Sequence, residues 1–174
     1  MEKVKTYKLV NGKRIDTGKT YERDSEWKSD EQDFYIVGIN NWIVNKKGEF
    51  LVQRRALTKK NNPGKYSSTN GLIQLDETNI DTVIRETKEE LNIDISKDKI
   101  ILVEENHIVG GHLLVDIFLT IKDIDLENIT IQENEVDLVK YVSLEELINL
   151  DISTTCSYIK EIAPKIYDIY KKNI

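Results

Sequence analysis

Acidic residues gather near the end of one predicted helix, in the segment from Gly71 to Ile93. Glu86, Glu89 and Glu90 fall at i, i+3 and i+4, so their side chains project from one helix face. The end of a helix disfavours anions, and like charges at this spacing cost a further penalty of about 0.2–0.5 kcal/mol. A hard cation such as Mg²⁺ or Mn²⁺ would offset both penalties, because these ions select carboxylate oxygens. For the glutamates alone, a solvated acidic surface is the alternative.

The sequence also marks where this helix begins and ends. Thr78 is a good N-cap, and Asp81 three residues later resembles a capping box. Apolar residues recur at helical spacing up to Leu91. Asn92 can adopt the left-handed conformation that ends a helix. We therefore predict a helix from about Thr78 to Leu91, with an apolar face packed on the rest of the protein.

Two short segments near the N-terminus, 5–9 and 13–20, flank Asn11-Gly12, which is a strong hairpin-turn signal. Residues 21–33 are polar and predict a loop that crosses to the main domain. We expect 1–33 to belong to the same structural unit as the domain formed by 34–174. The further predicted strands are 34–45, 49–54, 99–107, 112–121 and 136–142; a long loop at 56–70 and helices at 143–150 and 154–172 complete the prediction.

This order of elements predicts an α/β (α+β) fold, in which a mixed β-sheet lies between helices and carries an N-terminal β-hairpin. A chain of 174 residues is long enough for one such domain with a sizeable core. The net charge of −6 argues against a general affinity for nucleic acid, but it allows one phosphorylated small molecule in a basic pocket. The single cysteine, Cys156, cannot form an internal disulfide. No apolar run approaches the length of about 20 residues that spans a membrane, so we expect a cytoplasmic protein.

The 71–93 segment resembles the Nudix box, G-x5-E-x7-R-E-U-x-E-E-x-G-U, in which U is a bulky aliphatic residue. The matching positions are Gly71, Glu77, Arg85, Glu86, Glu89, Glu90 and Ile93. Thr87 replaces an aliphatic residue that packs the helix, and Asn92 replaces a glycine at the helix end. Neither replacement removes a charged position of the box. The resemblance implies a Nudix fold.

The stretch from Phe50 to Ile95 is similar to the branch of this superfamily related to isopentenyl-diphosphate isomerase. The run R-R-A-L-x-K-K, followed by P-G and an aromatic residue, is typical of that branch. Asn70 stands where the isomerase has a cysteine, and Leu72 stands where it has a metal-binding histidine. Hydrolysis of a diphosphate therefore fits this chain better than isomerisation.

The resemblance assigns roles to residues in and around the box. Arg85 would pair with Glu77 and hold the helix in register, while Gly71 is structural. Glu135 is expected to be the assisting carboxylate outside the box, with Glu133 as the alternative; Glu135 could instead only brace the last strand. The catalytic set is then Glu86, Glu90, Glu135 and Arg85, and the metal ligands are Glu86, Glu89, Glu90 and Asn70 through its backbone carbonyl.

Substrate contacts are expected from Arg55 and Lys59, which match diphosphate-binding positions, and from Tyr66, which could stack on a flat group. His107 and His112 are interpreted as strand-end or surface residues. The implied function is a Mg²⁺- or Mn²⁺-dependent pyrophosphohydrolase that cleaves a nucleoside diphosphate linked to another moiety. The alternatives are a non-catalytic, nucleotide-binding regulatory module and an isomerase-like enzyme. The expected partner is a small-molecule diphosphate, with no nucleic acid polymer and no membrane, and a homodimer stays open.

Overall fold

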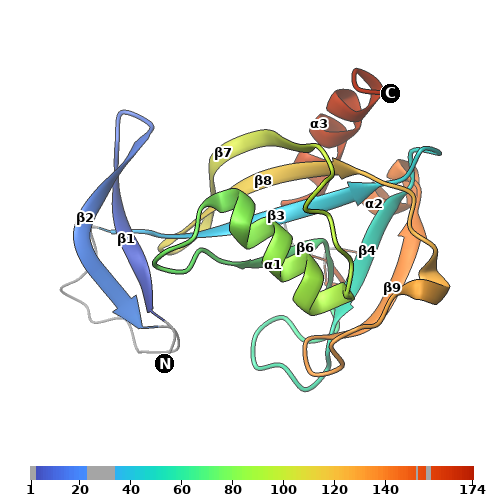
Figure 1. The fold of residues 1–174 in the computed structure, drawn as a ribbon, viewed down its shortest axis with the longest axis horizontal. Helices are drawn as coiled ribbons and strands as arrows, with labels where there is room; N and C mark the ends of the chain where they lie inside the picture. The colour runs from blue at the N-terminus through green and yellow to red at the C-terminus, as the bar shows by residue number, and fades with distance from the viewer. Residues whose placement is uncertain (1–2, 23–33, 152, 156–157) are drawn as a thin grey trace.

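The computed structural model describes residues 3–22, 34–151, 153–155 and 158–174, and it contains a mixed sheet with helices on both faces (Figure 1). The order of the main strands is β5-β4-β3-β8-β7, while β6 pairs with β3 and β9 pairs with β4. The central strand β3 is parallel to β8 and antiparallel to β4 and β6. The strands of this sheet are β3 (Ile36–Val44), β4 (Phe50–Arg55), β5 (Tyr66–Ser67), β6 (Thr69–Leu72), β7 (Ile100–Gly110), β8 (Leu113–Ile121) and β9 (Val136–Val142).

The helices bury different faces of this sheet. Helix α1 (Asn79–Leu91) packs through Val83 and Leu91 against one face of β3 and β8. Helices α2 (Leu144–Asn149) and α3 (Ile159–Lys171) cover the core around Trp42 on the other face. A short 3-10 helix, η1 (Leu126–Asn128), precedes β9. The predicted sheet between helices is confirmed. No helix in the described part of the chain has the length and apolar character needed to cross a membrane.

Helix α1 has the ends that its sequence predicts. The Thr78 side chain accepts a hydrogen bond from the Asp81 N–H, and the Asp81 side chain accepts one from the Thr78 backbone. Asn92 has φ 56° and its N–H donates to the Lys88 carbonyl, which closes the helix. Thr87 is fully buried, and its hydroxyl donates to the Val83 carbonyl at 2.7 Å. The polar replacement in the box therefore has its hydrogen bond satisfied inside the helix.

The N-terminal hairpin consists of β1 (Lys3–Val10) and β2 (Lys13–Glu22) and forms a separate two-stranded sheet. Figure 1 shows it at one end of the molecule, beyond the start of α1. Asn11 and Gly12 both have positive φ, as their turn requires. The hairpin meets the rest of the chain through the backbone bonds between Tyr7 and Tyr35 and through an ion pair between Arg14 and the buried Asp116. Of the crossing loop predicted at 21–33, residues 21 and 22 instead form the end of β2, and residues 23–33 lie outside the described part of the chain.

Two sequence predictions need correction. The segment 56–70 is not one loop, because β5 and the start of β6 lie in it; strands of two and four residues are too short to leave a periodic pattern. The last helix begins at Ile159 rather than at 154. Thr154 cannot join it because its carbonyl accepts a hydrogen bond from the Tyr66 N–H, which ties this segment to β5. The sequence prediction for Cys156 falls outside the described residues.

Candidate active site

A cleft of about 350 Å³ opens between α1, β6 and the loops that flank β4 and β9. Its walls differ in chemistry. The acidic side chains that line it are Glu86, Glu89, Glu90 and Glu135; the basic ones are Arg55, Lys65 and Arg85. Val109, Leu113 and Val115 form an apolar end, beside Tyr158. The structure thus brings the acidic box residues together with Asn70, Gly71, Arg55 and Glu135, which lie far apart in the sequence.

Arg85 on α1 binds residues at the start of the box, Glu77 and Leu72. Its guanidinium donates to both oxygens of Glu77, at 2.5 and 2.9 Å, and also to the Leu72 carbonyl at 3.2 Å. Hydrogen bonding to Arg85 is the main reason that the pKa of Glu77 is lowered. The same guanidinium reaches Glu86 at 2.7 Å and Glu89 at 3.1 Å. The pairing predicted from the box is present, and it aligns α1 with β6.

Gly71 lets a carboxylate lie directly against the backbone of β6. A Cβ atom at this position would be 1.8 Å from Oε1 of Glu86, closer than any real contact. Any side chain at Gly71 would therefore displace Glu86 from the cleft. The glycine of the box is required by this close approach rather than by a turn.

Glu90 is a buried acid held by amides. Its side chain belongs to a residue that is only 5% exposed, and Gln53 Nε2 donates to its Oε2 at 2.6 Å. Burial, followed by the charges of Glu86 and Glu135, raises the pKa of Glu90 to about 8, against the opposing effect of hydrogen bonds from Gln53 and the Asn70 backbone. No arginine or lysine among the described residues forms an ion pair with it. A buried carboxylate in this setting requires either a proton or a cation.

The donor chemistry of the cleft fits a hard divalent cation, since carboxylate oxygens of Glu86, Glu89 and Glu90 lie beside the backbone at Asn70. The carboxylates do not converge, however: in the described part of the chain no group of three acidic, histidine or cysteine side chains is close enough to hold a metal ion. Arg85 binds two of them instead. A metal would therefore have to share these carboxylates with the guanidinium or displace it, and the assignment of Glu86 and Glu89 as ligands stays a prediction.

The predicted substrate residues occupy three different positions. Arg55 lines the cleft, and the preceding Arg54 points away from it and pairs with Asp137 at 2.7 Å. Lys59 lies at the rim, where its Nζ is 2.6 Å from Oε1 of Glu135. Tyr66 does not line the cleft and packs under Lys140, with Nζ 4.7 Å from the ring centre. Of the three, only Arg55 lines the cleft directly.

The sequence analysis missed several residues of the cleft. Gln53 is one, because nothing in the sequence connects it with Glu90. Asn40 is another: its Nδ2 donates to the Tyr158 hydroxyl at 2.9 Å and its Oδ1 accepts from Ser68 at 2.7 Å. A polar residue inside an otherwise apolar strand was the available signal for Asn40. His107 pairs with Glu104 at 2.6 Å and does not line the cleft. It lies within β7 with a side chain that is 11% exposed, rather than at a strand end or on the surface.

Comparison with known proteins gives a consistent family. Residues 35–160 match the NUDIX domain family. The isopentenyl-diphosphate Delta-isomerase of Escherichia coli (strain K12) is 38% identical over 89 residues, which are 51% of this chain and 47% of that enzyme. The match thus spans about half the length of this curated relative.

Solved structures share the fold. DR0079 from Deinococcus radiodurans has a TM-score of 0.73 and 17% identity, and the match covers 93% of this chain and 99% of that one. The MutT protein from Methanosarcina mazei Go1 has a TM-score of 0.65 and 24% identity, over 79% and 96% of the two chains. The NUDIX domain of Shewanella oneidensis NrtR, solved with ADP ribose, has a TM-score of 0.64 and 13% identity, over 83% and 94%.

Proposed function

The chain belongs to the NUDIX domain family, and from this premise we propose that it is a metal-dependent hydrolase that cleaves the diphosphate bond of a nucleoside diphosphate linked to another moiety. One observation carries the proposal. Glu90 is buried next to Glu86 at the wall of a cleft, and in the described part of the chain it has amide donors but no cationic partner. An acid held in this way is ready to bind a divalent cation.

The residues of the cleft would have different roles in the reaction. Glu90, Glu86 and Glu89 would hold Mg²⁺ or Mn²⁺ together with the backbone at Asn70. When bound, such an ion neutralises diphosphate oxygens and lowers the pKa of water. Arg85 keeps the glutamates in register through Glu77. Glu86 would accept the proton of the attacking water, and Glu135, which lines the same cleft, would assist as the carboxylate outside the box.

The opposite wall suits the substrate. Arg55 and Lys65 supply positive charge to the cleft, which favours the diphosphate group. The apolar end at Val109, Leu113 and Val115 can enclose a less polar part of the substrate, and Tyr158 adds an aromatic ring. We propose further that the hairpin belongs to the same unit as the domain, because Arg14 binds the buried Asp116.

Two other functions are weighed against this one. An isomerase is disfavoured because Asn70 and Leu72 replace the cysteine and histidine of the related isomerase branch. A regulatory module that only binds a nucleotide is disfavoured because Glu86, Glu89 and Glu90 are all retained. ADP ribose is bound by the NUDIX domain of NrtR, so it belongs in any panel of test ligands for this chain.

The test is a hydrolysis assay with Mg²⁺ or Mn²⁺ and a panel of nucleotide sugars, dinucleoside polyphosphates, ADP ribose, NADH, nucleoside triphosphates, CoA and isoprenyl diphosphates. We expect cleavage of at least one substrate and a loss of about a thousandfold in kcat for Glu90→Gln. The matched control is Glu145→Gln, which removes an equal charge from an exposed position of α2. Binding without turnover under either metal would favour the regulatory module, and double-bond migration in isopentenyl diphosphate would favour the isomerase.

A further inference from the structure

Glu135 lies between two cations that were expected to bind substrate. Lys59 Nζ is 2.6 Å from its Oε1, and Arg55 Nη1 is 3.6 Å from its Oε2. All three side chains are about one quarter exposed, at 24 or 25%. Partly shielded ion pairs of this kind are screened less by water and salt than fully exposed ones. The expected assisting carboxylate thus holds both expected diphosphate-binding residues and cancels part of their positive charge.

Backbone bonds hold the Glu135 turn at the edge of the cleft. The Ala56 N–H donates to the Glu135 carbonyl at 2.8 Å, which attaches the turn to the end of β4. The Gln132 N–H donates to the Glu90 carbonyl at 3.0 Å, which attaches it to α1. Glu135 also lines the same cleft as Glu86 and Glu90. Its side chain therefore pairs with the basic rim and borders the cleft that carries the acidic wall.

Ligands of opposite charge would compete with this arrangement from both sides. A diphosphate beside Arg55 needs the same guanidinium and ammonium groups that Glu135 now holds. A divalent cation beside Glu90 would gain a further carboxylate from Glu135, which Lys59 now holds. The Nε of Arg55 already donates to the Asn61 carbonyl at 2.8 Å, so its side chain stays at the cleft whichever anion its other nitrogens bind.

We propose that the Glu135 carboxylate, held by Lys59 and Arg55, competes with a diphosphate group for these two cations, and that a diphosphate bound there leaves the carboxylate to the divalent cation. This inference rests on the proposed function, because it concerns how the diphosphate of the substrate and the divalent cation affect each other's binding at the same site. A diphosphate and a cation then favour each other's binding, through an exchange of partners at Glu135.

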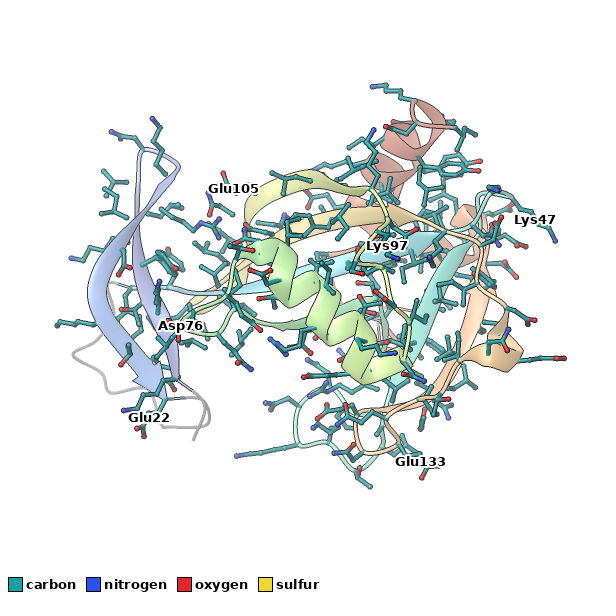
Figure 2. The ribbon with its side chains drawn as sticks, viewed as in Figure 1. Glu22, Lys47, Asp76, Lys97, Glu105 and Glu133 are labelled. Atoms are coloured by element: carbon teal, nitrogen blue, oxygen red, sulfur yellow. The ribbon has the colours of Figure 1, made fainter. Side chains whose placement is uncertain are left out.

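The first test measures diphosphate binding in the absence of metal. The probe is methylenediphosphonate, whose bridging carbon resists hydrolysis, titrated by calorimetry in the presence of EDTA. We expect Glu135→Gln to bind it about tenfold more tightly than the unaltered protein does, because the competing anion is gone. The matched control is Glu133→Gln. Glu133 is exposed, does not line the cleft, and lies at the outer edge of the same turn (Figure 2).

Both variants remove one negative charge, so a general change in net charge would affect them equally. Affinity for Glu135→Gln that is equal to that of Glu133→Gln, or weaker than that of the unaltered protein, would overturn the proposal. Thermal melts of each variant verify the fold, and Glu135→Ala repeats the measurement with a different side chain. A role of Glu135 in bracing the loop alone predicts weaker binding for both Glu135 variants.

The second test measures the reciprocal effect with Mn²⁺ alone, by the electron paramagnetic resonance signal of the free ion. Lys59→Met should bind Mn²⁺ several-fold more tightly, because it releases Glu135. Lys60→Met, which removes the same charge from an exposed neighbour, should show a smaller change. Equal affinities for the two variants would refute the release of Glu135 to the cation.

Neither test depends on turnover. If no substrate in the hydrolysis panel is cleaved while Glu135→Gln still tightens diphosphonate binding, the proposed hydrolysis fails and the exchange at Glu135 stands. If cleavage is observed and disappears in Glu90→Gln, while Glu135→Gln binds diphosphonate no more tightly, the proposed hydrolysis stands and the exchange at Glu135 fails.

Discussion

Two buried carboxylates at opposite ends of α1 are held in different ways. Asp116 on β8 is fully buried, and Arg14 Nη1 lies 2.8 Å from its Oδ2. The Asn106 N–H and the Asn79 side chain donate to it as well. Glu90 is nearly as buried, but only amide groups of the described residues donate to it.

The two carboxylates therefore differ in their partners: Asp116 pairs with a cation of the same chain, whereas Glu90 lines the cleft with amide donors. Burial raises the pKa of Asp116 as well, against the opposing effects of the Asn106 N–H and Arg14. The partners of Asp116 join the hairpin, β7 and the start of α1. Glu90 has no cationic partner among the described residues, and its pKa is raised to about 8, with burial as the largest cause. An acid that the fold leaves without a cationic partner, at the wall of a cleft, is available to a ligand.

The largest expected effect on stability concerns the hairpin joint. Arg14→Met should lower the free energy of unfolding by about 3 kcal/mol, because it leaves Asp116 buried without its cation. Arg54→Met is the control, since it breaks a more exposed pair with Asp137 and should cost much less stability. Urea denaturation measures both values. Equal losses of stability in the two variants would mean that the Arg14–Asp116 ion pair adds little to the docking of the hairpin. The double variant Arg14→Met with Asp116→Asn should recover part of the lost stability, because no buried charge is left unpaired.

The next effect is the dependence of stability on pH in metal-free protein. The pKa of Glu90 is higher in the folded chain than its ordinary value of 4.5. Its contribution is therefore fully present below about pH 4.5 and is lost as the pH rises through about 8. Relative to the unaltered protein, Glu90→Gln should gain a few kcal/mol in unfolding free energy as the pH rises from about 5 to 9.

Urea denaturation at several pH values, with EDTA present, measures this difference. Parallel pH profiles for the two proteins would show that Glu90 is ionised without penalty, and the contrast with Asp116 would then disappear. Added Mn²⁺ should reduce the difference at high pH, because it stabilises the ionised carboxylate.

The smallest effect concerns the amide that holds Glu90. Gln53→Met keeps the approximate volume but removes the donor at 2.6 Å, so Mn²⁺ affinity should fall about tenfold. The variant also removes Gln53 Oε1, which has no hydrogen-bond partner within the described structure, and this offsets part of the stability lost when Glu90 loses its donor. Thr87→Val is the control, a buried polar group on α1 whose hydroxyl bonds to its own helix. If both variants bind Mn²⁺ equally well, Gln53 does not orient Glu90.

Much of α1 and its acidic face could be predicted from the sequence, because the relevant contacts are local. Thr78 and Asp81 form the predicted capping box, and Asn92 adopts the predicted left-handed conformation. Glu77 and Arg85 pair within the box. The helix period alone places Glu86, Glu89 and Glu90 on neighbouring positions, whatever the rest of the chain does. The short strands β5 and β6 left no comparable pattern, since they are defined by their partners in the sheet.

The sequence by itself therefore determined the helix, its ends and the cluster of acids on it, because each follows from spacing over a few residues. Only the tertiary structure decided the partners of those acids. Gln53 meets Glu90 across 37 positions of the sequence, and Lys59 meets Glu135 across 76. The hairpin likewise supplies Arg14 to a strand near the middle of the chain. Such pairs arise when the sheet brings distant strands side by side, so a buried carboxylate acquires or lacks a cation only through the packing of the whole domain.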